Sequence, residues 1–106
     1  LKKDMAPIDW TRSPWEISCH VRGMQPWPVA AMTLGGKQFK VYAVRPIEGE
    51  TELPDGTPVA VTKKGLEMAC GGGKLLLVET IQAQGGKRMS SADYFRGHPL
   101  SPGDRL

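Results

Sequence analysis

Apolar residues recur with helical periodicity in residues 13–24, "SPWEISCHVRGM". Ile17, Val21 and Met24 recur at intervals of four and three residues, which places them on one face of an α-helix. The polar residues between them fall largely off that face. The spacing therefore predicts an amphipathic helix whose apolar stripe is buried.

The ends of this helix are also marked in the sequence. Ser13 is a good cap, Pro14 suits the first helical position, and Glu16 completes a capping box with the serine. Gly23 relaxes the closing turn, and the residue before Pro26 avoids helical geometry. We therefore expect a helix that begins at Pro14 and ends between Gly23 and Pro26.

A proline-rich stretch follows the helix. Pro26 and Pro28 hold the backbone extended on either side of Trp27. They direct the chain into a strand that begins near Val29, and the indole between them is expected to fill the core.

Beyond this point the pattern changes to β. Apolar runs rich in strand-forming residues are separated by turn sequences such as "GGK", "PDGT" and "GGGK". The strand-like segments are "VAAMTL", "QFKVYAVRP", "PVAVTKK", "LEMAC" and "LLLVETIQA". Near the end, "SSADYFRG" predicts a short helix that is capped by Ser90 or Ser91 and closed by Gly97.

These elements predict a mainly β fold. Short strands with glycine turns favour a small Greek-key barrel of about six strands, with one N-terminal helix and one short C-terminal helix. The 106 residues suffice for a single domain, of which residues 1–7 are expected to be a linker remnant. Four aromatic side chains are expected in the core rather than at a stacking surface: Phe39, Tyr42, Tyr94 and Phe95.

No catalytic or metal-binding constellation is present in the sequence. His20 and His98 lie too far apart, with too few further ligands, for a histidine-based metal site. Cys19 and Cys70 are the only cysteines, and we interpret them as two buried free thiols, although counting alone also allows one disulfide. The "GGGK" stretch lacks the frame of a phosphate-binding loop. We expect no catalytic activity from this chain alone and no metal or cofactor bound to it.

The charge of the chain is mildly basic and unevenly distributed. Fourteen lysines and arginines stand against eleven acidic residues, which gives a formal net charge of +3. Four of the acids gather in one predicted loop: Glu48, Glu50, Glu52 and Asp55. The remainder of the chain is therefore more basic, which suits a polyanionic partner, although a solvated surface without a ligand gives the same count. No apolar run approaches the roughly 18 residues of a membrane span, so we expect no membrane contact. We also expect a cytoplasmic, monomeric protein.

The basic residues concentrate at predicted turns. Lys37 and Lys40 flank one hairpin turn, Lys74 follows the glycine turn, and Lys87 and Arg88 follow the long strand. Lys63 and Lys64 occupy a further turn. Basic turns around one barrel rim can form a groove that reads a nucleic-acid backbone with little sequence preference and strong salt dependence. Lysine is also common at exposed turns that bind nothing, and for any one residue this alternative carries equal weight.

The motifs of the chain resemble a known family. "IDW" at residues 8–10, "VRGMQPWP" through Pro28, "GKQFKV" and "GGKRMSSADYFRG" occur in the order and spacing of the C-terminal domain of methionyl-tRNA formyltransferase. The resemblance extends from about Lys3 to Leu106. Val29 departs from the family pattern, which usually has glycine after "PWP".

The resemblance implies a fold and a function. The fold would be an open barrel related to the oligonucleotide-binding fold, attached to an N-terminal catalytic domain. That domain would transfer a formyl group from 10-formyltetrahydrofolate to methionine on initiator tRNA, in translation initiation. The family's catalytic residues belong to that domain and have no matching positions here.

The same resemblance suggests where tRNA would bind. Arg22 matches the family's arginine at the helix end, Lys40 its hairpin lysine, and Lys87 and Arg88 its basic pair. Lys37 and Lys74 are added from their turn positions alone. The predicted partners are initiator tRNA and the N-terminal catalytic domain. The alternative is a structural C-terminal domain of another 10-formyltetrahydrofolate-dependent formyltransferase or hydrolase, without nucleic-acid contact.

Overall fold

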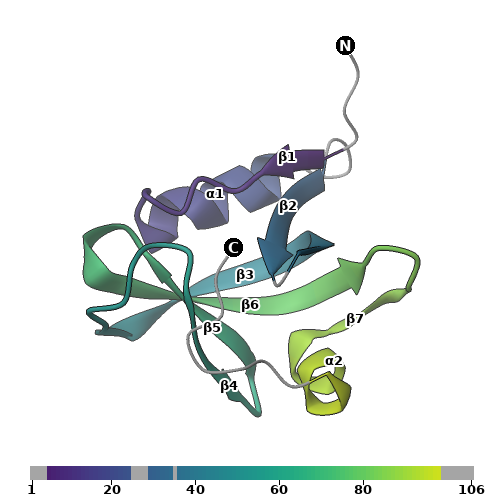
Figure 1. Ribbon diagram of the computed structural model, residues 1–106. Coiled ribbons are helices and arrows are strands. Elements are labelled where there is room, and N and C mark those ends of the chain that lie inside the picture. Colours follow the sequence, from purple (N-terminus) through teal and green to yellow (C-terminus); the bar gives the residue numbers. More distant parts are fainter. Residues whose placement is uncertain (1–4, 25–28, 35, 99–106) are drawn as a thin grey trace.

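The computed structural model describes residues 5–24, 29–34 and 36–98, and within them the chain is mainly β, as predicted (Figure 1). The elements in chain order are β1 (Met5–Pro7), α1 (Pro14–Met24), β2 (Val29–Leu34), β3 (Lys37–Glu50), β4 (Pro58–Thr62), β5 (Gly65–Cys70), a short 3-10 turn (Gly71–Gly73), β6 (Lys74–Ala83), β7 (Arg88–Ser90) and α2 (Ser91–Gly97).

The strands form one sheet in the order β1-β2-β3-β6-β5-β4, with β7 added alongside β6. Every pairing is antiparallel except that of β1 with β2. Within the described residues no ladder joins β1 to β4, so the sheet is open. The order β3-β6-β5-β4 is the Greek-key arrangement that the short strands predict.

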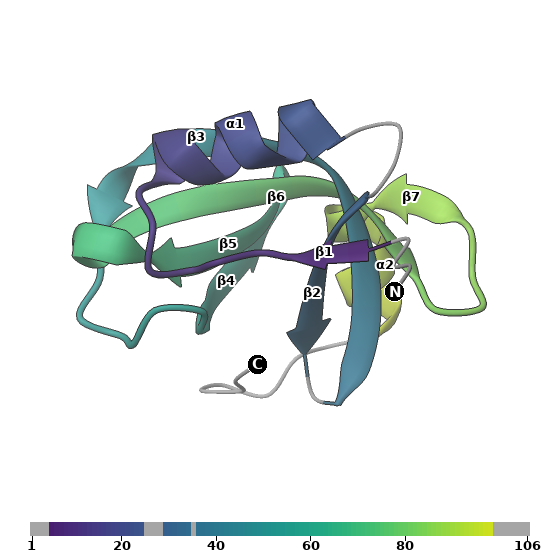
Figure 2. The same ribbon diagram turned by 90° about the horizontal axis from the view of Figure 1, so that it is seen from above.

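The two helices lie apart from each other in both views, and both pack on the face of the sheet that carries the core (Figures 1 and 2). Ile17 and Val21 from α1 are each 1 % exposed and join one continuous core with the sheet. Tyr94 and Phe95 from α2 join the same core, where Phe39 packs edge-on against Tyr94 with 5.2 Å between ring centroids. The buried stripe predicted for Ile17 and Val21 is confirmed, whereas the side chain of Met24 lies outside the described residues.

The start of α1 is the capping box that the sequence predicts. The Glu16 backbone N–H donates to Ser13 Oγ at 3.2 Å, and the Ser13 backbone N–H donates to Glu16 Oε1 at 3.1 Å. The helix ends at Met24. The predictions for Pro26, Trp27 and Pro28 fall outside the described residues, and β2 begins at Val29 as expected.

Three expectations are corrected at this level. Met5–Pro7, predicted as part of a linker, form β1 beside β2. The predicted acidic loop begins later, because β3 continues to Glu50. Cys19 is exposed rather than buried; only Cys70 is buried, and both thiols are free, so there is no disulfide.

The two candidate caps of α2 have different roles. Ser90 is the cap, because its side chain accepts a hydrogen bond from the Asp93 backbone N–H at 3.1 Å. Ser91 is fully buried and joins two strands. Its hydroxyl accepts from the Leu66 backbone N–H at 3.0 Å and donates to the Val78 carbonyl. Ser91 therefore satisfies polar groups of both β5 and β6.

The glycine turn after β5 has a packing role. The Gly71 backbone N–H donates to the Arg12 carbonyl at 2.9 Å, and a Cβ built on Gly71 would lie 2.1 Å from the Thr11 carbonyl oxygen. Only a glycine permits the segment before α1 to approach this closely. The turn thus positions the start of α1 against the sheet.

Candidate nucleic-acid interface

Three neighbouring strands bring two predicted site residues together. In the sheet, Lys40 of β3 pairs with Gln82 of β6, and Gln82 pairs with Arg88 of β7. Directly paired residues point to the same side of a sheet, so these three side chains form one row. We call Lys40, Gln82 and Arg88 the basic row.

The basic row lies on the outer face of the sheet. One residue away along each of these strands, the next row of paired residues is formed by Val41, Ile81 and Met89. Val41 and Ile81 are fully buried, and Met89 packs against the core. Because successive side chains of a strand alternate between faces, Lys40 and Arg88 are directed away from the core.

Tyr42 supports the basic row from the same face. The Arg88 guanidinium lies 3.7 Å from the centroid of the Tyr42 ring. The Tyr42 hydroxyl donates to Gln82 Oε1 at 2.8 Å, and Gln82 Nε2 donates to the Gly86 carbonyl at 2.9 Å. The tyrosine thus fixes both the guanidinium and the amide, and through the amide it fixes the β6–β7 turn.

Tyr42 is therefore not a core residue as predicted, and it is only half-buried. Phe39, Tyr94 and Phe95 are buried, as expected. The sequence signal that was available for Tyr42 is its spacing two residues from Lys40, on the outward-facing half of the strand. Gln82 was also missed as a candidate site residue, because its partners come from other strands.

Ion pairs divide the predicted site residues into two groups. Lys74 Nζ lies 3.0 Å from Glu50 Oε2, which offsets its charge. No ion pair joins a carboxylate to the other five in the part of the chain that the structure describes: Arg22, Lys37, Lys40, Lys87 and Arg88. These five cations therefore keep their charge available for an external anion.

Lys74 is also remote from the basic row. It begins β6, whereas Gln82 lies eight residues further along the same strand, about 26 Å in an extended chain. Its neighbours include the acidic end of β3 at Glu48 and Glu50. The domain is thus polarised along β3, with acids at one end and the basic row toward the other.

The remaining predicted residues are distributed around the row. Lys87 is exposed in the turn directly before Arg88. Lys37 is exposed and pairs with Leu34 at the hairpin. It lies three residues before Lys40, and because side chains alternate along a strand, it points to the other face of β3. Arg22 lies on α1, which packs chiefly against β3. The structure therefore brings Lys40 and Arg88 together, with Lys87 adjacent, and leaves Lys37 on the opposite face.

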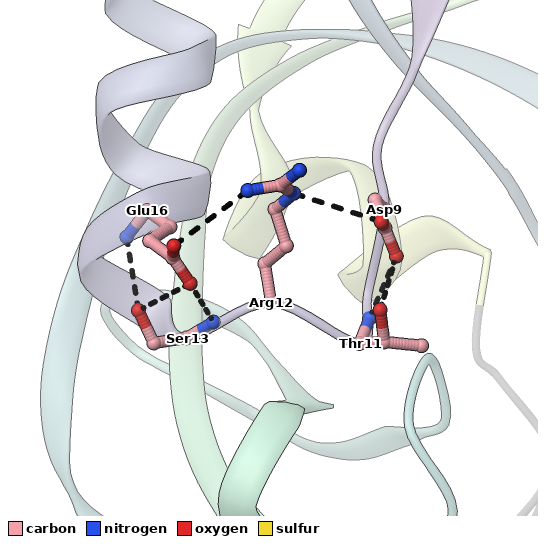
Figure 3. Close-up of polar contacts among 5 residues, drawn as sticks. All are labelled: Asp9, Thr11, Arg12, Ser13 and Glu16. Carbon is pink, nitrogen blue, oxygen red and sulfur yellow. Dashed lines mark hydrogen bonds and ion pairs between the residues drawn. The ribbon is translucent and has the colours of Figure 1, made fainter.

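Arg12 shows the contrasting case of a cation that the fold neutralises (Figure 3). Its guanidinium bridges two carboxylates, with 3.6 Å from Nε to Asp9 Oδ2 and 3.6 Å from Nη1 to Glu16 Oε2. Hydrogen bonds from Thr11 lower the pKa of Asp9, and hydrogen bonds from Ser13 lower the pKa of Glu16, so both stay ionised. This network stabilises the start of α1 and leaves little charge for a ligand.

The side chains of the basic row can bind an anion. Lysine and arginine supply donors for phosphate oxygens, and the planar guanidinium of Arg88 can bind two of them at once. Among the residues that the structure describes, no three His, Cys, Asp or Glu side chains are grouped as a metal site requires. His98 stacks on Tyr94, with 4.2 Å between the ring centroids, at the end of α2.

Comparison with known proteins identifies the family. The sequence pattern described as "Formyl transferase, C-terminal domain" matches residues 1–99. The chain belongs to this family. It is 42 % identical over 106 residues to a methionyl-tRNA formyltransferase of Geotalea daltonii, and 39 % identical over 106 residues to that of Bacillus subtilis. All of this chain is covered in both comparisons, but only 33 % of each relative.

This formyl transferase C-terminal domain therefore spans about a third of the length of the relatives it matches. In its described residues, neither helix is both long and apolar enough to cross a bilayer.

Proposed function

We propose that this domain binds initiator tRNA through the basic row and Lys87, as part of a methionyl-tRNA formyltransferase. In this proposal the domain contributes binding energy and positions the tRNA, and a second domain carries out formyl transfer. The formyl donor, expected to be 10-formyltetrahydrofolate, binds to that second domain.

The observation that carries the proposal is the alignment of Lys40 and Arg88 on one outward face without internal ion pairs. The fold neutralises Arg12, Arg45, Lys74 and Arg96 with its own carboxylates. A cation without such a partner gains more from a phosphate, because no existing ion pair has to be broken. The names of the relatives, which contain "methionyl-tRNA", support tRNA as the polyanion.

Salt dependence of tRNA binding by the 106-residue chain tests the proposal. Phosphate contacts release condensed counterions, so the logarithm of the affinity should fall linearly with the logarithm of the salt concentration. Contacts from Lys40, Lys87 and Arg88 predict a slope of about −2 to −3. Absence of saturable binding at low salt would instead favour a structural domain that packs on its catalytic neighbour.

A further inference from the structure

Trp15 is unusually exposed for a tryptophan. It lies in the first turn of α1 and 63 % of its surface is exposed, more than for the other two exposed large apolar residues of the described chain, Leu53 and Val61. By contrast, Trp10, five residues earlier, is 8 % exposed and belongs to the core. The fold therefore does not use the Trp15 indole for packing in its interior.

Arg22 lies over this indole. Its guanidinium carbon is 5.3 Å from the centroid of a Trp15 ring, and its Nη2 is 3.6 Å from Cys19 Sγ. Side chains of a helix point toward its N-terminus, so an arginine seven residues after a tryptophan reaches back along the same face. The small Cys19 lies between them in sequence and permits this approach. The result is an exposed face of α1 that presents an indole, a guanidinium and a thiol together.

The charge of Arg22 is not offset by any carboxylate of the described residues. Arg12 at the other end of α1 is held by two of them. The partners of Arg22 are instead an aromatic ring and a sulfur, neither of which carries a negative charge. Arg22 therefore remains able to bind an anion while it keeps the indole in place.

We propose that Trp15 and Arg22 form a nucleotide subsite, in which the indole stacks on an unpaired base of the bound RNA and the guanidinium contacts its phosphate. Stacking on aromatic side chains and on guanidinium planes is the usual way in which proteins hold bases that have left a helix. The inference rests on the proposed function, because it assigns a second contact to the same RNA. α1 packs on the core face of β3 and begins beside the Gly71 turn, whereas Lys40 points outward toward the other end of the strand, so the subsite is a contact separate from the basic row.

Charge favours RNA over a protein surface as the occupant. A protein partner of an exposed tryptophan needs an apolar surround, but among the described residues the printed contacts of this pair are with a cation and a thiol, Arg22 and Cys19, and the domain carries a net charge of +3. A nucleotide supplies both features that the pair offers to bind, a flat apolar base and a negative phosphate.

The test compares four variants of the 106-residue chain in titrations with an initiator tRNA transcript: Trp15→Ala, Trp15→Phe, Arg88→Ala, and Leu53→Ala as an exposed apolar control. Stacking predicts that Trp15→Ala weakens binding about fivefold or more, that Trp15→Phe restores much of the loss, and that the salt slope is unchanged. The Leu53→Ala variant should bind as the unmodified chain does. Retained helical circular dichroism in the Trp15 variants confirms that the fold is intact.

The outcomes separate this inference from the proposed function. If Arg88→Ala weakens binding and Trp15→Ala does not, the nucleotide subsite is refuted and the basic row stands. If neither substitution weakens binding, both are refuted. If Trp15→Ala leaves tRNA affinity unchanged but loosens the association with the rest of a formyltransferase, the face is a protein contact and the subsite is again refuted.

Discussion

The guanidinium of Arg88 lies on the ring of Tyr42, 3.7 Å from its centroid, although the two residues belong to strands that are separated in the sheet by β6. The tyrosine holds the cation on the outer face, and its hydroxyl holds Gln82 between them. A positive charge that is fixed in this way loses little conformational entropy when it binds a phosphate.

This arrangement predicts a specific role for Arg88 in RNA binding. Arg88→Ala should weaken tRNA binding about tenfold and make the salt slope less steep by about one, because one phosphate contact is lost. Arg96→Ala is the matched control, since Arg96 is exposed on α2 and already paired with Asp93 at 3.1 Å. Equal losses in the two variants, measured by fluorescence anisotropy, would show that only total charge matters.

Ser91 should matter more for stability than its neighbour Ser90. Ser91→Ala leaves the Leu66 N–H and the Val78 carbonyl without their buried partner, at a cost of about 2 kcal/mol or more. Ser90→Ala removes a helix cap, which costs about 1 kcal/mol. Urea unfolding of both variants measures the difference, and a larger loss for Ser90→Ala would contradict the assigned roles.

The glycine turn should tolerate no side chain at Gly71. Gly71→Ala places a Cβ against the Thr11 carbonyl and should destabilise the domain by about 1–3 kcal/mol or more. Gly23→Ala, near the end of α1, meets nothing within 4 Å and should leave the stability unchanged or raise it by up to about 1 kcal/mol. Thermal unfolding distinguishes these, and a neutral Gly71→Ala would mean that the segment before α1 is not held as described.

The two thiols should differ in reactivity. Burial raises the pKa of Cys70 to about 11, whereas Cys19 is exposed on α1. At pH 8 a thiol reagent should therefore modify Cys19 quickly and Cys70 only after unfolding, as followed by mass spectrometry. A variant with Cys19→Ser should show almost no fast reaction, and fast labelling of that variant would contradict the burial of Cys70.

The raised pKa of Cys70 also gives an expected pH dependence. The folded state holds this proton more tightly than the unfolded chain, in which the pKa of the thiol is near 9.0. The contribution to stability is therefore complete below pH 9 and is lost as the pH rises toward about 11. Cys70→Ala should flatten this alkaline part of a stability-pH profile, measured as the urea midpoint.

The parts of the fold that the sequence predicts are those with local causes. The capping box at Ser13 and Glu16 and the stripe of Ile17 and Val21 depend only on spacing within one helix. The exposure of Cys19 was available from the same spacing, since it falls two residues from Ile17 and off the buried stripe.

The features that the sequence did not predict depend on contacts between distant segments. The pairing of Lys74 with Glu50 links residues 24 apart and places a carboxylate beside this cation. The close approach of Gly71 to Thr11 has no local signature. Tyr42 lies where the β3–β6 register shifts, between Val41 and Ala43, and its partner Arg88 comes from a third strand. The spacing of residues within one strand carries no information about these contacts between distant segments.

If the basic row binds tRNA as proposed, the position of the cations and not the total charge determines the affinity. Two double variants test it most directly, Lys40→Gln with Arg88→Gln and Lys74→Gln with Arg96→Gln, because each removes two positive charges. The first pair of substitutions should weaken tRNA binding by more than about tenfold, whereas the second pair should bind within about twofold of the unmodified chain. Equal weakening by the two pairs in a titration at fixed salt, or no weakening by the first, would contradict it.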